Sequence, residues 1–271
     1  MSIDSEWKTM PTEVVLLNSI TDAGTDAVGK IGVSGSHGGL FAAAVASRAG
    51  LRAVALNDAG IGLDQAGIAG LIALDQVGMA GIAVTANSAE IGSAQDSLDN
   101  GIVGFVNETA QRLGVRPGLP LIDQIHLLAN ASEPSSRLAE VAETRQSVQI
   151  NKTQVLCVDS ASMITPDDAG SIIVTGSHGG LIGGDPARAC KANAGFVAFN
   201  DASGGKNDMG FTRLPALAAR GIAAVTLRHD SCKIGDAQSA LATGIISRSN
   251  AAAQNLGFLP DQSLLSSFTT R

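Results

Sequence analysis

Aromatic side chains are scarce in this chain of 271 residues, which has seven Phe, one Trp and no Tyr. Its formal net charge of −7 shows that basic residues are not in excess either. Proteins that bind nucleic acid use cationic surfaces for the phosphates and, on single strands, aromatic rings for the bases. We therefore expect no nucleic-acid partner.

Cysteine is equally scarce. The three cysteines, Cys157, Cys190 and Cys232, are an odd number and have no paired spacing. Disulfide frameworks and structural zinc sites use cysteines in pairs, often at short intervals. We expect neither kind of site in this protein.

Long apolar runs are missing too. No run is long enough to span a bilayer, and residues 1–12 carry acidic side chains instead of the basic and apolar pattern of a signal peptide. The sequence therefore predicts a cytoplasmic protein with no membrane partner.

Small residues are abundant, with 32 Gly in the chain, and much of the sequence occurs twice. The second occurrence lies 141 to 143 positions after the first, and the spacing from Asn57 to Asn107 equals that from Asn200 to Asn250. The repeated motifs are SGSHGGL (34–40) with TGSHGGL (175–181), NDA (57–59) with NDA (200–202), and SAEIGSAQ (88–95) with SCKIGDAQ (231–238). This phasing predicts a tandem duplication.

The duplication predicts three parts of the chain. They are a first repeat over residues 1–118, a helical connector over 119–152, and a second repeat with a C-terminal tail over 153–271. Within the connector, Leu138, Val141 and Ala142 stand at helical spacing, so we expect one amphipathic helix over 133–145.

Short apolar runs alternate with helical patterns in each repeat. Strands are predicted at 14–17, 30–34, 53–56 and 80–85, with counterparts at 155–158, 171–175, 195–199 and 222–227. Helices are predicted at 40–48 and 71–77, and a long one at 94–113, with a counterpart at 237–256. Continuous apolar strands between helices are typical of parallel sheets covered on both faces. The predicted fold is α/β, a tandem duplication of two Rossmann-like, mainly parallel halves related by pseudo-twofold symmetry.

The Gly-Ser-His-Gly-Gly turns follow predicted strands, at the sheet edge where ligands bind in such folds. Their amides could bind an anion, with a hydroxyl and an imidazole beside them. This predicts that the substrate is bound by Ser36, His37, Gly38, Ser177 and Gly179, with His178 moving a proton. The alternative is a tight turn whose serine caps the next helix.

The Asn-Asp pairs end the next predicted strand in each half. Asp201 could orient His178 and raise its basicity, while Asn57, Asp58 and Asn200 would complete the substrate contacts. The alternative is an Asx turn that shapes the following loop. A metal held by the histidines and aspartates is a weaker alternative, because the histidine spacing is not that of metal ligands.

Charge distinguishes the two repeats. Residues 13–118 carry five basic and ten acidic residues, whereas 153–258 carry eight of each. At aligned positions the second repeat replaces Leu63, Thr85, Ala86, Ala89 and Glu90. The replacements are Lys206, Arg228, His229, Cys232 and Lys233. This predicts that the second repeat dominates one site for an anionic ligand.

Cys232 precedes Lys233, which could lower the pKa of its thiol and make it a nucleophile. A lone cysteine more often fills a small buried space, and we favour that interpretation. The candidate catalytic set is His178, Asp201, Lys206, Cys232 and Lys233, and the substrate contacts include Arg228 and His229.

Together these patterns predict a small-molecule enzyme, a hydrolase or lyase that needs no cofactor and no metal. Its partner would be a small anionic or amide-containing metabolite, and we expect a homo-oligomer built on twofold contacts. The alternative from another class is a non-catalytic or regulatory protein that binds a small anion in the same cleft.

Overall fold

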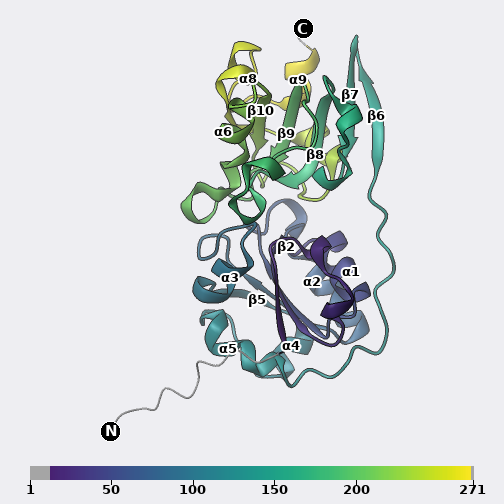
Figure 1. Cartoon of the computed structure of the whole chain (residues 1–271), viewed down its shortest axis with the longest axis vertical. Coiled ribbons are helices and arrows are strands. Elements are labelled where there is room, and N and C mark those ends of the chain that lie inside the picture. Colours follow the sequence, from purple (N-terminus) through teal and green to yellow (C-terminus); the bar gives the residue numbers. More distant parts are fainter. Residues whose placement is uncertain (1–12, 270–271) are drawn as a thin grey trace.

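The computed structural model describes residues 13–269, which form a mixed α/β fold with two mainly parallel sheets of five and six strands. The sheets are stacked end to end along the longest axis of the molecule (Figure 1). No helix in residues 13–269 is long and apolar enough to cross a bilayer.

The first sheet has the strand order β1-β2-β3-β4-β5. Strands β1 to β4 are parallel, and β5 pairs antiparallel with β4 at one edge. Every residue of β3 and β4 is buried, which explains their continuous apolar sequences. The strands are β1 (Val14–Leu17), β2 (Ile31–His37), β3 (Ala53–Asn57), β4 (Ala80–Val84) and β5 (Val103–Val106).

Helices cover both faces of this sheet. The crossover helices α1 (Leu40–Arg48) and α2 (Ala69–Ala73) pack on one face, as right-handed connections between successive neighbouring strands require. On the other face lie α3 (Ala94–Asn100), α4 (Glu108–Arg112) and α5 (Leu121–Leu128). This neighbour-to-neighbour order differs from the dinucleotide-binding fold, whose first strand is central, so the parallel strands have no point at which the order reverses.

The second sheet has the order β11-β10-β9-β8-β7-β6, with antiparallel strands at both edges. Its strands are β6 (Arg145–Ile150), β7 (Thr153–Val158), β8 (Ile172–His178), β9 (Phe196–Asn200), β10 (Ala223–Leu227) and β11 (Ile246–Ser249). Its helices are α6 (Arg213–Ala218), α7 (Ala237–Thr243), α8 (Ala251–Asn255) and α9 (Leu264–Thr269). No α-helix follows β8 as α1 follows β2, because short 3-10 turns at Ile182–Gly184 and Pro186–Arg188 take that place.

The carboxyl-terminal edges of the two sheets face each other. The Leu63 N–H donates to the His229 carbonyl at 2.9 Å, and the Lys206 N–H donates to the Ala86 carbonyl at 2.8 Å. Lys206 stands 143 positions after Leu63, and His229 stands 143 positions after Ala86, so the two bonds are equivalent with the halves exchanged. Between the sheets, Ala59, Ile91, Ala202 and Ile234 form a small buried apolar cluster.

Two predicted helices are wrong. The stretch 94–113 contains α3, β5 and α4, because Gly101 leaves the helical conformation and the apolar run after it joins the sheet. The corresponding stretch 237–256 is divided in the same way into α7, β11 and α8.

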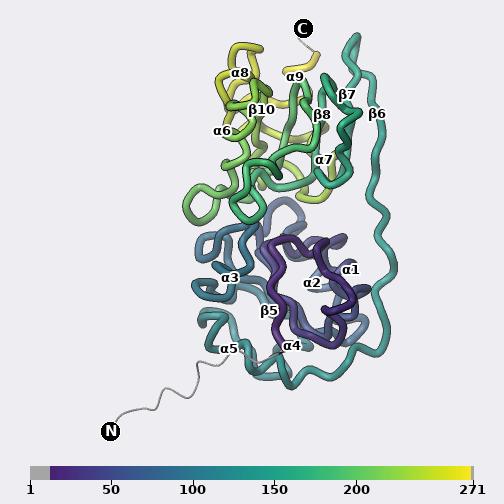
Figure 2. The backbone as a smooth tube through the Cα atoms, viewed as in Figure 1, coloured from purple at the N-terminus to yellow at the C-terminus, as the bar shows by residue number. Residues whose placement is uncertain are grey.

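The predicted connector helix over 133–145 is also wrong. The helix of this region is α5, and the chain then runs without regular structure to β6, which pairs with β7. Leu138 packs on the first half, and its N–H donates to Ser47 Oγ, so a tertiary contact replaces the helix. Figure 2 shows this segment passing along the outside of the molecule from one half to the other.

Candidate functional site

A cavity of about 380 Å³ lies between the two halves. The repeated Gly-Ser-His-Gly-Gly turns reach it from opposite sides, so that Ser36 and His37 share its wall with Ser177 and His178. Glu143, Asp159, Arg188, Lys191 and Arg213 also line it. The structure thus brings together the histidines and serines of the two turns that the sequence singled out.

Glycines let these turns pack closely against neighbouring segments of the same half. The Gly38 N–H donates to the Asn57 carbonyl, and the Gly179 N–H donates to the Asn200 carbonyl. A Cβ at Gly38 would lie 2.7 Å from the Gly67 carbonyl oxygen, and one at Gly179 would lie 2.2 Å from that of Gly210. Both glycines therefore serve close backbone packing, and neither is among the residues that line the cavity.

Backbone amides fix the tautomer of both imidazoles. The Gly39 N–H donates to His37 Nδ1 at 3.1 Å, and the Gly180 N–H donates to His178 Nδ1 at 3.2 Å. Since Nδ1 accepts, the proton of each neutral ring is on Nε2. Each ring can then act as a hydrogen-bond donor through Nε2.

Burial keeps both imidazoles neutral. It lowers the pKa of His37 to about 4. Burial also lowers the pKa of His178 well below its usual value, helped by the nearby positive charge of Arg213 and by His37. Neither ring is therefore a strong base at neutral pH, and both are suited to donate a hydrogen bond.

The two serines are held in matching ways. Ser36 Oγ accepts from the Ile20 N–H at 3.0 Å, and Ser177 Oγ accepts from the Ala161 N–H at 2.8 Å. Within residues 13–269 neither hydroxyl donates to another protein group. Each hydroxyl hydrogen is therefore available to a ligand in the cavity.

Arg213 brings a buried positive charge to the cavity, with only 2% of the residue exposed. Its guanidinium donates to the carbonyls of Gly180, Arg188 and Ala189. Burial lowers its pKa to about 10, so it remains charged at neutral pH. None of the carboxylates in residues 13–269 forms an ion pair with it.

Acidic groups also line the cavity. Burial, together with the neighbouring Asp159, raises the pKa of Glu143 to about 7, against a hydrogen bond with Ser160 that lowers it. The carboxylate of Asp159 accepts from the Thr144 N–H and hydroxyl and from the Ala237 N–H. The carboxyl group of Glu143 can therefore exchange a proton near neutral pH.

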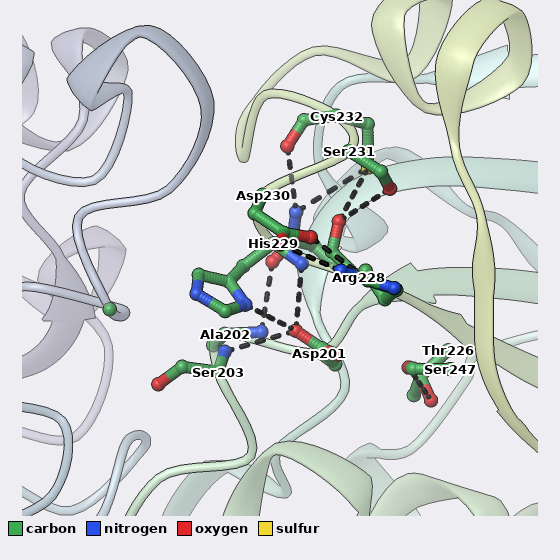
Figure 3. A network of polar contacts seen from close by, with 12 residues as sticks. Asp201, Ala202, Ser203, Thr226, Arg228, His229, Asp230, Ser231, Cys232 and Ser247 are labelled. Carbon is green, nitrogen blue, oxygen red and sulfur yellow. Dashed lines mark hydrogen bonds and ion pairs between the residues drawn. The ribbon is translucent and has the colours of Figure 1, made fainter.

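The predicted pairing of His178 with Asp201 is wrong. Asp201 Oδ1 accepts from the backbone N–H groups of Ser203 and His229 and lies 3.3 Å from Nδ1 of the His229 ring (Figure 3). This contact raises the pKa of His229. The aspartate is turned toward the loops after β9 and β10, because one backbone amide in each of them needs an acceptor there.

The Asx-turn alternative accounts for the Asn-Asp pairs. Asp58 Oδ1 accepts from the N–H groups of Gly60 and Ala86, and burial raises the pKa of its carboxyl. Asn57 Oδ1 accepts from the Ala59 N–H, as Asn200 Oδ1 accepts from the Ala202 N–H. These side chains build the loops on which the two halves meet, and they do not line the cavity.

The predicted cationic rim is also not part of the cavity. Lys206 forms an ion pair with Asp96 at 2.7 Å, and Lys233 forms one with Asp64 at 2.8 Å, so both link the second half to the first. Arg228 pairs with Asp230 in its own loop at 2.9 Å (Figure 3). These cations balance acids of the protein because the first half is acidic where it faces the second.

Cys232 is fully buried, as the favoured interpretation predicted. Burial raises the pKa of its thiol to about 12, the opposite of what a nucleophile needs. The Asn200 amide lies 3.6 Å from its sulfur and donates to its carbonyl (Figure 3 draws this neighbourhood). In residues 13–269 no group of three or more His, Cys, Asp or Glu side chains is placed to hold a metal ion.

Sequence reasoning missed Arg213, Arg188, Lys191 and Glu143. Arg213 carried a usable signal, because it stands 143 positions after Gly70 and is a basic gain of the second half. Arg188 and Lys191 lie where the halves stop resembling each other, so no aligned partner draws attention to them. Glu143 lies in the irregular segment between α5 and β6, outside the repeated motifs.

Comparison with known proteins adds no name to this site: no protein-family model, curated protein or solved structure matches the chain.

Proposed function

We propose that the cavity between the halves binds a small metabolite bearing a carboxylate or amide, and that the chain is an enzyme acting on it without a cofactor. One observation carries the proposal. Two imidazoles with Nε2 protonated and one buried guanidinium without an acidic partner line the same cavity. Such a wall matches a ligand rich in oxygen acceptors.

A lyase fits the wall better than a hydrolase. Glu143, with a pKa of about 7, is suited to remove a proton from carbon, and an Nε2–H of His37 or His178 would polarise the adjacent carbonyl or carboxylate. As the carbon–carbon double bond forms, an oxygen or nitrogen substituent on the neighbouring carbon would leave with the electron pair of its own bond and take up a proton from the protonated Glu143 or from water. A hydrolase would need an activated nucleophile. The thiol of Cys232 is buried, and the serines have only neutral imidazoles with occupied Nδ1 atoms beside them.

The second candidate is a non-catalytic protein that binds a small anion in the same cavity. The low pKa values of both histidines favour it, since they make the rings donors and not bases. The two candidates differ in the need for Glu143, which a binding protein would not require.

The test begins with a thermal-shift screen of small carboxylic acids and amides, followed by NMR detection of product for each stabilising compound. In a lyase, Glu143→Gln should abolish product formation and leave binding within a few-fold. Glu140→Gln is the matched control, because Glu140 lies in the same segment but is exposed. Turnover that persists in Glu143→Gln, or binding without any turnover, would refute the lyase proposal.

We further propose that the chain arose by tandem duplication, with a pseudo-twofold relation between its halves. The reciprocal bonds between Leu63 and His229 and between Lys206 and Ala86 support this, as do the matched turns at His37 and His178. A cytoplasmic location, a homo-oligomeric state and the three-part division at 118 and 152 remain predictions.

A further inference from the structure

The two sides of the cavity differ in chemistry. The first half contributes the apolar side chains of Ile20, Phe41 and Ala42, whereas the second contributes Arg188, Lys191 and Arg213. Arg188 lies 3.5 Å from Asp22, and Lys191 Nζ donates to the Ser162 carbonyl at 2.6 Å. Lys191 and Arg213 thus have only carbonyls as hydrogen-bond acceptors in the described chain, and Arg213 differs from Lys191 in being buried, with 2% of the residue exposed.

The buried cation of the second half follows from one position in the chain, at which the first half has Gly70 and the second half has Arg213. Gly70 and Arg213 make the same backbone bond, to the carbonyls of Gly38 and Gly179, each at 2.9 Å. At Gly70 a Cβ would lie 2.2 Å from the Gly39 carbonyl oxygen, so only glycine lets α1 pack there. In the second half the chain after β8 is not helical, and the Arg213 side chain reaches the carbonyls of that segment.

A buried cation without a counter-ion is unfavourable, even when carbonyl dipoles surround it. An anion in the cavity would offset that cost. On the wall formed by Glu143 and Asp159, a second anionic group would instead be repelled. The first-half wall, with Phe41 and Ile20, offers contact to an apolar group.

We infer that the ligand is a monocarboxylic acid with an apolar body, bound with its carboxylate toward Arg213 and its body toward Phe41. This inference rests on the proposed function and specifies the substrate class of that same cavity. Arg213 would act as the carboxylate anchor, and Phe41 on α1 would select the apolar end.

The test compares three six-carbon probes by calorimetry: hexanoate, hexanamide and adipate. Hexanoate should bind at least about tenfold more tightly than hexanamide, because a charge-assisted hydrogen bond is lost with the amide. Adipate should bind at least about tenfold more weakly than hexanoate, because its second carboxylate meets apolar and acidic groups. No binding of hexanoate at about 10 mM, where even weak affinities are measurable, would overturn the inference.

Substitution separates anchoring from a purely structural role. Arg213→Met should remove the preference for hexanoate over hexanamide. Arg220→Met is the matched control, since Arg220 also donates to carbonyls of this segment, those of Cys190 and Ala192, but does not line the cavity. The preference should survive in Arg220→Met. Its survival in Arg213→Met would refute the anchor.

A second variant, Phe41→Ala, tests the proposed orientation of the ligand independently of Arg213. If Arg213→Met does not fold, Phe41→Ala should still weaken hexanoate about tenfold while keeping the preference over hexanamide, as loss of a buried aromatic contact predicts. Unchanged affinity in Phe41→Ala would contradict the orientation. The assays measure binding alone, and hexanoate carries no group that a lyase could eliminate. Selective binding of hexanoate would therefore leave this inference standing even if the product screen refuted the lyase.

Discussion

The imidazoles of His37 and His178 are each held in one protonation state by a backbone amide two residues further along the chain. A short Gly-Gly segment after the histidine makes this possible, because it brings the second glycine N–H back to Nδ1. A Cβ at Gly39 would lie 2.7 Å from His37 Nδ1, so a larger residue would displace the ring. The repeated motif thus encodes the tautomer as well as the turn.

This arrangement predicts a loss of stability in acid. The pKa of His37 is about 4 in the folded protein and near 6.5 when unfolded, so the unfolded chain binds the proton first as the pH falls. The free energy of unfolding should be constant above pH 6.5 on this account and fall by about 3 kcal/mol between pH 6.5 and pH 4.

The measurement is urea unfolding across that pH range for the wild type and for His37→Asn. Asparagine keeps an acceptor near the Nδ1 position but does not titrate. The free energy of unfolding of His37→Asn should therefore fall by about 3 kcal/mol less between pH 6.5 and pH 4. Parallel pH profiles for the two proteins would contradict the assignment. His178 remains in both, so some acid dependence persists.

At the scale of single residues, the sequence alone pointed to part of the cavity wall. The repeated motif indicated Ser36, His37, Ser177 and His178 together, because the same residues occur in both turns. It could not show that Asp201 faces His229, since that depends on which backbone amides lack an acceptor. Sequence could not show the ion pair of Lys206 either, because its partner Asp96 lies in the other half.

At the scale of elements, α1 and the irregular segment after β8 are the main difference between the halves. Helix α1 packs against α2 with buried Ala42, Ala43 and Ala46, and Gly70 forms the closest approach. Sequence predicted β1 to β4 and β7 to β10, because their apolar runs are continuous, but it did not predict β5, β6 or β11. It failed on the stretch 94–113, where the helical pattern continues across β5. That segment is a strand because it pairs with β4, which the local pattern does not show.

Gly70→Ala should destabilise the protein, because its Cβ would meet the Gly39 carbonyl oxygen and Ala43 Cβ at 2.2 and 2.6 Å. Alanine is a better helix former than glycine, so any loss of stability in this variant must be steric. We expect the free energy of unfolding to fall by about 2 kcal/mol or more. Chemical denaturation of the purified variant measures it.

Gly118→Ala is the matched control for this substitution. Gly118 has a φ of +87° but no atom within 4 Å of its Cβ position, so only backbone strain applies. That strain should cost about 1 kcal/mol. A loss in Gly70→Ala no larger than in Gly118→Ala would show that α1 can move away from α2.

At the scale of the whole molecule, the halves are joined by backbone bonds, a small apolar cluster and ion pairs. The pair between Lys206 and Asp96 is the better shielded, with side chains 24% and 17% exposed. Lys206→Met should lower the free energy of unfolding by about 2 kcal/mol, because it leaves Asp96 without its cation.

Arg112→Met provides the comparison, since Arg112 and Glu108 form an exposed pair within one helix. Its removal should change the free energy of unfolding by less than about 0.5 kcal/mol. Equal effects of the two substitutions, measured by thermal or urea unfolding, would mean that the contact between the halves contributes little to stability.

The reciprocal main-chain bonds between the halves have one more consequence. Bonds between backbone groups do not depend on which side chains the loops carry, so two identical half-chains could form them across a twofold axis. In such a symmetric pair, every substitution would appear on both walls of the cavity. The two halves of this chain differ in sequence, so Phe41 lines the cavity from the first half without a second copy, and Arg213 lines it from the second. The cavity can therefore distinguish the two ends of a ligand.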